Sequence, residues 1–198
     1  LAKKQEVKYV KWRDENGIET GAIVRCPLNI DSNQKYPAIF DIYERKSEQQ
    51  HEYLSPFENS MVGFNWREYT DRGYFVIEPD NYYEYTKPGL SATRAVTTAI
   101  KELSKKFPID VDKLGLIGHS WGGYETNFII TQTDTFKAAV SGAGIADITN
   151  WYLSVNWTGM RPEFWRYTDE ETFRMKHKLF DIPEQYLANS PIFQSRSI

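Results

Sequence analysis

The clearest chemical signal in the sequence is a serine that lies between two glycines. Gly118, Ser120 and Gly122 have the spacing Gly-x-Ser-x-Gly, which is typical of a sharp turn where a buried strand passes into a helix. A side chain at either outer position would collide with the neighbouring strand or helix. The turn exposes the serine hydroxyl, and the N-terminus of the helix stabilises negative charge that develops beside it. The pattern predicts that Ser120 is a nucleophile on a backbone that has a positive φ or is otherwise strained. The alternative is a serine that only caps the helix.

A nucleophilic serine needs a base that accepts its proton, and the sequence offers few candidates. Of the three histidines, only His177 follows Ser120, which is the order found in hydrolases with this turn. His177 lies in the charged stretch 170–178, which we expect to be a solvated helix. We expect the side chain of His119 to point away from the hydroxyl, and His51 precedes the serine. Acidic residues after the serine fall in expected loops or helices, among them Asp134, Asp147, Asp169, Glu170, Glu171, Asp181 and Glu184. The sequence therefore predicts that no imidazole of this chain reaches Ser120.

The elements that would position Ser120 can be read from the pattern of apolar residues. A short apolar run at 114–118 predicts the strand before the serine, and 121–131 the helix after it. The other expected strands are apolar runs bounded by turn residues, at 5–12, 18–26, 37–43, 74–79 and 137–142. The other expected helices are 60–72 and a segment that is capped by Ser91 and carries one apolar stripe.

The order of these elements predicts the fold class. The turn residues 14–17 join the first two strands into an antiparallel hairpin. The later strands alternate with helices, which is typical of βαβ crossovers and a mostly parallel, doubly wound sheet. We therefore expect a single α/β domain over residues 1–198.

Composition argues against several classes of function. The 24 Lys and Arg residues nearly balance 27 Asp and Glu, for a net charge of −3, so no basic face is expected and nucleic-acid binding is disfavoured. No apolar run is long enough to span a membrane. Cys26 is the only cysteine and there are three histidines, so neither a disulfide framework nor a Cys- or His-based metal site is expected. We expect no metal and no cofactor.

Residues 118–124, Gly-His-Ser-Trp-Gly-Gly-Tyr, resemble the serine motif of the prolyl oligopeptidase family, whose dipeptidyl peptidase IV branch has Gly-Trp-Ser-Tyr-Gly-Gly-Tyr. Residues 135–143 are similar to the next strand of that family, and Tyr74 to Asp80 resemble its Gly-Tyr-x-Val-x-x-Pro-Asp segment. Residues 188–191 resemble the Ser-Pro that precedes the strand with the catalytic Asp. The likeness extends from Gly17 to the last residue. It implies an α/β-hydrolase domain that cleaves peptides through an acyl-enzyme on Ser120.

The resemblance also implies roles around the serine. The backbone N–H of Trp121 and the hydroxyl of Tyr43 would donate to the oxyanion. Tyr43 is followed by Glu44-Arg45-Lys46 where the family usually has a Gly-Gly-Pro-like turn, and simple packing is the alternative for this tyrosine. The specificity pocket would comprise Trp121, Ile145, Ile148 and Trp151, with Tyr152 or Val155 as further candidates. These apolar side chains would suit proline, alanine or another small apolar residue before the cleaved bond. Core packing is the alternative for each.

The family pattern continues beyond Ile198 with the strand that ends in the triad Asp, so we expect a C-terminally incomplete domain that lacks the triad Asp and His. Such a chain would show no appreciable peptidase activity alone. It would leave an open sheet edge, covered by the remainder of its own polypeptide or by a second copy. Two other functions stay open: a carbohydrate esterase or other carboxylic-ester hydrolase on the same fold, and a non-catalytic interaction domain.

Overall fold

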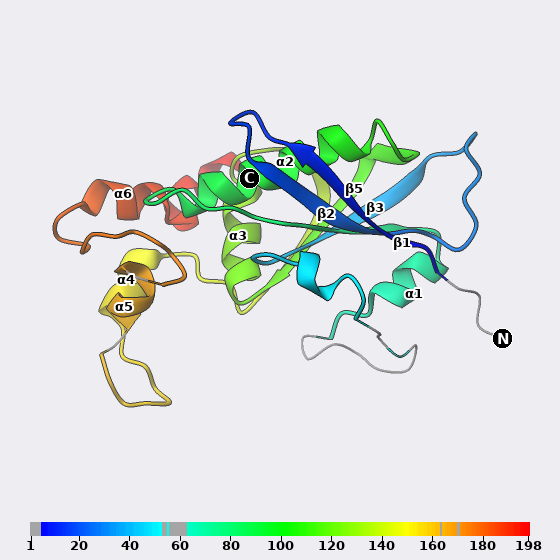
Figure 1. Cartoon of the computed structure of the whole chain (residues 1–198). Coiled ribbons are helices and arrows are strands. Elements are labelled where there is room, and N and C mark those ends of the chain that lie inside the picture. Colours follow the sequence, from blue (N-terminus) through cyan, green and yellow to red (C-terminus); the bar gives the residue numbers. More distant parts are fainter. Residues whose placement is uncertain (1–4, 53–54, 56–62, 163, 170) are drawn as a thin grey trace.

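In the computed structural model, a six-stranded sheet runs through the middle of the molecule (Figure 1). The structure describes residues 5–52, 55, 63–162, 164–169 and 171–198. The strands are β1 (Val7–Arg13), β2 (Glu19–Arg25), β3 (Tyr36–Ile42), β4 (Phe75–Pro79), β5 (Ile109–His119) and β6 (Phe136–Gly142). The helices are α1 (Trp66–Asp71), α2 (Pro88–Leu103), α3 (Trp121–Ile129), α4 (Ile148–Leu153), α5 (Phe164–Asp169) and α6 (Pro183–Ala188), with short 3-10 turns at Ser47–Gln49 and Pro191–Ser197.

The order of the strands in the sheet is β1-β2-β4-β3-β5-β6. β1 and β2 form the expected antiparallel hairpin, and β2 also runs antiparallel to β4. The pairs β3–β4, β3–β5 and β5–β6 are parallel. The prediction of an α/β fold with a mostly parallel sheet and an N-terminal hairpin is therefore confirmed.

The two faces of the sheet carry different helices. α2 and α3 cover one face and bury a large apolar core with β2, β3, β4 and β5, in which Phe40, Phe75 and Leu116 are almost fully enclosed. α1 lies on the opposite face (Figure 1), where Trp66 packs with Phe64 and Val76. Because the carboxyl ends of parallel strands meet at one edge of the sheet, this layering places the turn after β5 beside the end of β3.

β6 is the last strand of the sheet and is largely exposed, although its sequence is apolar. Val140 is 57% exposed. A hollow of about 450 Å³ extends from β6 across β5 and β3 to α1, lined by apolar residues that include Ile39, Ile117 and Ala138. The face of the sheet covered by α2 and α3 is thus largely buried, whereas the face beside α1 has an exposed apolar hollow toward β6.

Two local expectations were wrong. The helix expected to begin at Ser91 begins at Pro88, so Ser91 lies in its first turn, where its hydroxyl donates to the Lys87 carbonyl and accepts from the Glu84 N–H. The charged stretch expected to be helical is irregular between α5 and α6, because Phe173 and Met175 turn into the core together while their charged neighbours stay outside. Part of the helix expected at 60–72 lies outside the described residues, and α1 begins at Trp66.

Candidate active site

Ser120 lies at the sharp turn between β5 and α3, as the glycine spacing predicts. Its backbone is strained, with φ 56° and ψ −112°. The Ser120 N–H donates to the Gly142 carbonyl at 2.7 Å, which ties the turn to β6. The hydroxyl is exposed and makes no capping bond to the helix, so the interpretation of Ser120 as a helix cap is wrong.

The close backbone contacts around this turn explain its two glycines. A Cβ atom at position 118 would lie 2.2 Å from the carbonyl oxygen of Gly122, and one at position 122 would lie 2.2 Å from that of Ile42. Both obstacles are backbone atoms within packed elements, so neither can move aside cheaply. The glycines allow α3 to approach the end of β3.

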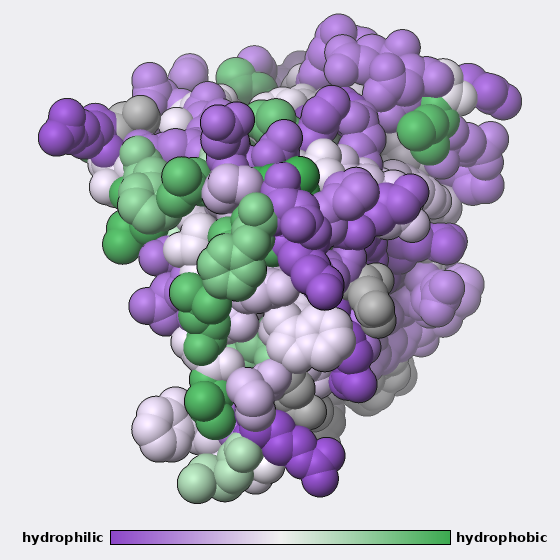
Figure 2. Space-filling view, turned by 90° about the vertical axis from the view of Figure 1, so that its left-hand side faces the viewer, coloured by the Kyte–Doolittle hydropathy of each residue, from purple (hydrophilic) through white to green (hydrophobic). Residues whose placement is uncertain are grey.

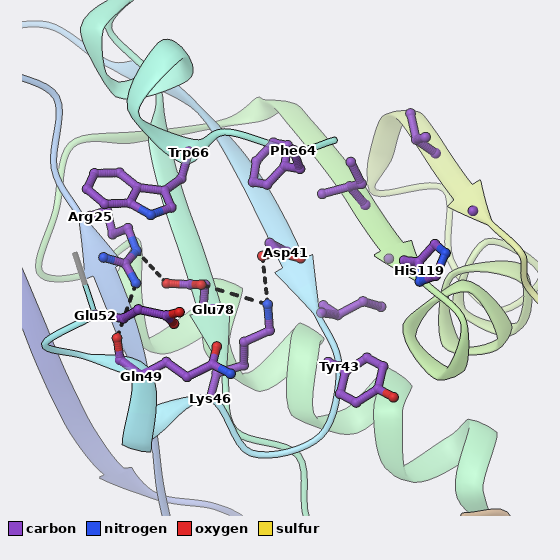
Figure 3. Close-up of a pocket in the computed structure, with 15 residues that line it drawn as sticks. Arg25, Asp41, Tyr43, Lys46, Gln49, Glu52, Phe64, Trp66, Glu78 and His119 are labelled. Carbon is purple, nitrogen blue, oxygen red and sulfur yellow. Dashed lines mark hydrogen bonds and ion pairs between the residues drawn. The ribbon is translucent and has the colours of Figure 1, made fainter. Parts of the chain in front are cut away.

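Tyr43 follows the last residue of β3 and lies beside the turn. The register pairs Ile42 with Gly118, which brings Tyr43 next to the first turn of α3. A Cβ atom at position 122 would be 3.5 Å from the ring of Tyr43. The Tyr43 side chain is 42% exposed, and Figure 3 shows it at the same end of a pocket as His119. The structure thus brings Tyr43, Ser120 and the N-terminus of α3 together.

The loop after Tyr43 is anchored by charged and polar groups. Lys46 pairs with Asp41 at 2.7 Å, and the carboxylate of Asp80 accepts from the backbone N–H groups of Lys46 and Ser47 at 2.7 and 2.8 Å. Lys46 also approaches Glu78 at 3.8 Å. These contacts of Lys46 and Ser47 hold the loop in place.

A pocket of about 280 Å³ lies between this loop and α1 (Figure 3). At its far end from Tyr43, the buried pair Arg25–Glu78 has a nitrogen–oxygen distance of 2.6 Å, and the Arg25 guanidinium lies 4.3 Å from the centre of the Trp66 ring. Arg25 and Glu78 neutralise each other, so we assign this pair a structural role at this end of the pocket.

The structure brings no histidine to Ser120. His119 lines the pocket on the α1 side, and His177 and His51 are exposed. Across the described ranges, no imidazole is hydrogen-bonded to the Ser120 hydroxyl. The described part of the chain thus presents a serine on a strained turn without a base beside it.

The residues expected to form the specificity pocket gather in one apolar cluster. Trp121 is buried and stacks on Tyr124, with ring centroids 4.7 Å apart. Ile145 and Trp151 are half-buried against the same cluster, and the Trp151 ring stacks on Phe164 at 3.8 Å. Ile148 is fully buried. It therefore offers no surface to a substrate in this structure and supports the cluster from behind.

Beyond this cluster, the side of the molecule formed by α4, α5 and α6 exposes further apolar residues. Figure 2 shows a band of hydrophobic side chains on this face. Exposed apolar residues of these segments include Leu153, Val155, Met160 and Phe180. Tyr152, the remaining candidate, is half-buried and lies with its ring edge-on to Phe180 and Tyr186.

Sequence reasoning missed a buried polar cluster behind Trp121. Glu125 is fully buried one helical turn after Trp121, and burial raises its pKa to about 8. Its Oε1 lies 2.5 Å from the Tyr83 hydroxyl oxygen and accepts from Asn81 Nδ2 at 2.7 Å. The signal was present, because Glu125 is a charged residue within the otherwise apolar face of the predicted helix. Its partners lie more than 40 positions away and could not be found by local pattern.

Two kinds of feature are absent from the described residues. No three His, Cys, Asp or Glu side chains come together as a metal ion would require. None of the described helices combines the length and the apolar character needed to cross a membrane.

Comparison with known proteins adds evidence that is independent of this geometry. The chain is 26% identical to the peptidase YuxL of Bacillus subtilis and 25% identical to dipeptidyl-peptidase 5 of Porphyromonas gingivalis, over 92% and 93% of its own length. It spans only 27% and 28% of those proteins.

Solved structures show the same fold. The acylaminoacyl peptidase of Pyrococcus horikoshii superposes on 99% of the chain with a TM-score of 0.72 at 20% identity, and the chain covers 31% of it. A puromycin-hydrolyzing peptidase of Mycobacterium tuberculosis superposes on the whole chain with a TM-score of 0.75 at 19% identity, and the chain covers 30% of it. The fold is that of the α/β-hydrolase peptidases.

The sequence profile of the prolyl oligopeptidase family matches residues 64–193. The match includes the strand before Ser120, the strained turn, the helix after it and the apolar cluster. The chain belongs to the prolyl oligopeptidase family.

Proposed function

We propose that this chain carries the nucleophile of a serine peptidase that cleaves peptide bonds through an acyl-enzyme on Ser120. The observation that carries the proposal is the exposed Ser120 hydroxyl on a backbone of φ 56°, at the N-terminus of α3 and beside Tyr43. A nucleophile in this position meets the first N–H groups of a helix, which have no acceptor within the helix. The relatives that bear the names dipeptidyl-peptidase and acylaminoacyl peptidase support the choice of peptides as substrates.

In the proposed reaction, Ser120 Oγ attacks the carbonyl carbon of the peptide bond and gives its proton to a base. The negative charge moves to the carbonyl oxygen, which accepts from the Trp121 N–H and from the Tyr43 hydroxyl. The base then protonates the leaving amine, and water hydrolyses the ester on Ser120. The half-buried Trp151 and Ile145 provide apolar surface for a small side chain before the cleaved bond.

The base in this proposal comes from further polypeptide of the same protein. Its docking place would be the open edge of β6 and the adjoining hollow, because these carry apolar side chains such as Val140 without cover. The chain spans less than a third of the relatives and structures compared above, so those proteins contain further polypeptide of the kind that the proposal requires. Amide hydrogen exchange tests whether further polypeptide covers β6. We expect slower exchange in β6 in the full-length protein than in the 198-residue chain. Protection that depends on protein concentration would instead indicate a second copy.

The test of the proposed function is hydrolysis by the full-length protein and its Ser120→Ala variant. We expect cleavage of Ala-Pro or Gly-Pro peptides by the wild type and a loss of about 10⁴-fold or more in Ser120→Ala. Ser104→Ala, at the far end of α2, is the matched control and should be unchanged. Faster hydrolysis of acetyl or feruloyl esters than of peptides would favour the esterase. No Ser120-dependent hydrolysis of either class would contradict an enzymatic role.

A further inference from the structure

The buried carboxyl of Glu125 has a hydrogen-bonding arrangement that its role as a helix residue does not require. It lies on α3 one turn after Trp121, with no exposed surface. Its contacts with the Tyr83 hydroxyl and with Asn81 Nδ2 are both at Oε1. Oε2 is buried and has no partner among the described residues. An ionised carboxylate with one empty oxygen is costly in such a site.

The Tyr83 hydroxyl connects Glu125 to the proposed catalytic apparatus. It accepts from Trp121 Nε1 at 2.6 Å, lies 2.5 Å from Glu125 Oε1, and lies 3.3 Å from the carbonyl oxygen of Tyr43. A tyrosine hydroxyl has one hydrogen and two acceptor sites, and an indole N–H can only donate. Tyr83 therefore keeps one hydrogen and one acceptor site for Glu125 and the Tyr43 carbonyl.

Counting hydrogens shows which protonation state fits this arrangement. If Glu125 is ionised, the carboxylate and the Tyr43 carbonyl compete for the single hydrogen of Tyr83. If Glu125 carries a proton on Oε1, it donates to Tyr83 and still accepts from Asn81, and the hydrogen of Tyr83 is free for the Tyr43 carbonyl. Each contact of the Tyr83 hydroxyl then has its own hydrogen, and Oε2 is the uncharged carbonyl oxygen of the acid.

The electrostatic surroundings favour the same state. Burial raises the pKa of Glu125 to about 8, and burial also raises the pKa of Tyr83 well above its usual range, so its hydroxyl keeps its hydrogen. The charged groups that face the site are Glu44, from the loop after β3, and Arg174, from the segment before α6. They pair with each other at 2.8 Å, and the Arg174 guanidinium lies 4.2 Å from the centre of the Tyr83 ring. The remaining titratable neighbour is the buried Tyr124 on α3 itself.

We propose that Glu125 is a positioning residue that, in its protonated form, sets the Tyr83 hydroxyl between the Trp121 indole and the Tyr43 carbonyl. This rests on the proposed function, because Trp121 and Tyr43 flank the nucleophile. When Glu125 is protonated, the Tyr83 hydroxyl donates to the Tyr43 carbonyl and holds the loop that carries Tyr43, the proposed donor to the oxyanion. Its loss draws the hydrogen of Tyr83 to the carboxylate and releases the Tyr43 carbonyl.

A Glu125→Gln variant would imitate the protonated acid at every pH. Its NH₂ group would donate to Tyr83. It would also donate to Asn81 once the Asn81 amide is turned, so that Oδ1, which is buried and without a partner, becomes the acceptor. Glu125→Ala removes the bond to Tyr83 and leaves a cavity. The two variants therefore separate the bonding role of Glu125 from its ionisation.

The experiment measures kcat and KM of the full-length enzyme between pH 6 and pH 10 for the wild type, Glu125→Gln, Glu125→Ala and the exposed control Glu184→Gln. In the wild type and the control we expect kcat to fall as the pH rises through about 8. In Glu125→Gln we expect near wild-type kcat at pH 7 without that fall. In Glu125→Ala we expect a kcat lower by about 10- to 100-fold at pH 7. An unchanged alkaline fall in Glu125→Gln, or wild-type kcat in Glu125→Ala, would overturn the proposal.

An infrared difference spectrum between wild type and Glu125→Gln tests the proton itself and needs no activity. We expect the carbonyl band of one protonated carboxylic acid at pH 7, and its loss by pH 10. A carboxylate band at pH 7 would refute the proton on Glu125 even if the enzyme is active. A protein with the acid band but no Ser120-dependent hydrolysis would instead contradict the proposed function, and with it the positioning role.

Discussion

The face of the sheet beneath α2 and α3 holds the large buried core of the molecule, whereas the face beside α1 has a smaller buried cluster and, among the described residues, an exposed hollow toward β6. On the filled face, Phe40 and Leu116 are almost fully enclosed. On the open side, Val140 is more than half exposed, next to a hollow. The parts of the site that depend on the filled face are formed: the strained turn, the helix N-terminus and the apolar cluster. No imidazole of the described residues is hydrogen-bonded to Ser120, and the proposal assigns the base to polypeptide over the open side.

The largest expected effect tests whether the two faces differ as described. Phe40→Ala should lower the free energy of unfolding by about 3–5 kcal/mol, because it leaves a cavity in a closed core. Val140→Ala in the same 198-residue chain should change it by about 0.5 kcal/mol or less, because the side chain is exposed. Chemical denaturation measures both values. A loss of several kcal/mol at position 140 would show that the open side is covered and would break the comparison.

The next effect concerns Tyr43, which follows β3 and lies beside the first turn of α3. Tyr43→Phe in the full-length enzyme should lower kcat by about 10²–10³-fold, because one donor to the oxyanion is lost while the ring is kept. KM should change little. Tyr85→Phe, at an exposed tyrosine elsewhere, is the control. An unchanged kcat in Tyr43→Phe would remove Tyr43 from the mechanism.

A smaller effect sharpens the account of the turn itself. Gly118→Ala should lower the free energy of unfolding by about 1–3 kcal/mol, because the new Cβ would meet the Gly122 backbone. Gly115→Ala, three residues earlier on β5, would place its Cβ 3.6 Å from the nearest atom. We expect that control to be close to neutral by the same measurement. Equal losses in the two variants would show that the close approach at position 118 is not what requires glycine.

The sequence was most informative where local pattern determines structure. The alternation of apolar runs with amphipathic segments was enough to predict the parallel sheet, and the glycine spacing predicted the strained turn at Ser120. Prediction from the sequence failed where contacts with residues distant in the sequence determine the local structure. Phe173 and Met175 are pulled into the core around Trp121, which prevents the helix that their charged neighbours favour. Glu125 was not identified because Asn81 and Tyr83 reach it from a separate segment.

Labelling of Ser120 by a fluorophosphonate probe is the most direct test of the central claim, because the reaction requires an activated serine. The account predicts rapid labelling of the full-length protein, no labelling of its Ser120→Ala variant, and slow labelling of the 198-residue chain, in which the described residues bring no imidazole to the hydroxyl. Equally rapid labelling of the 198-residue chain would contradict the claim that the base comes from further polypeptide. Rapid labelling of full-length Ser120→Ala would show that another residue is the nucleophile.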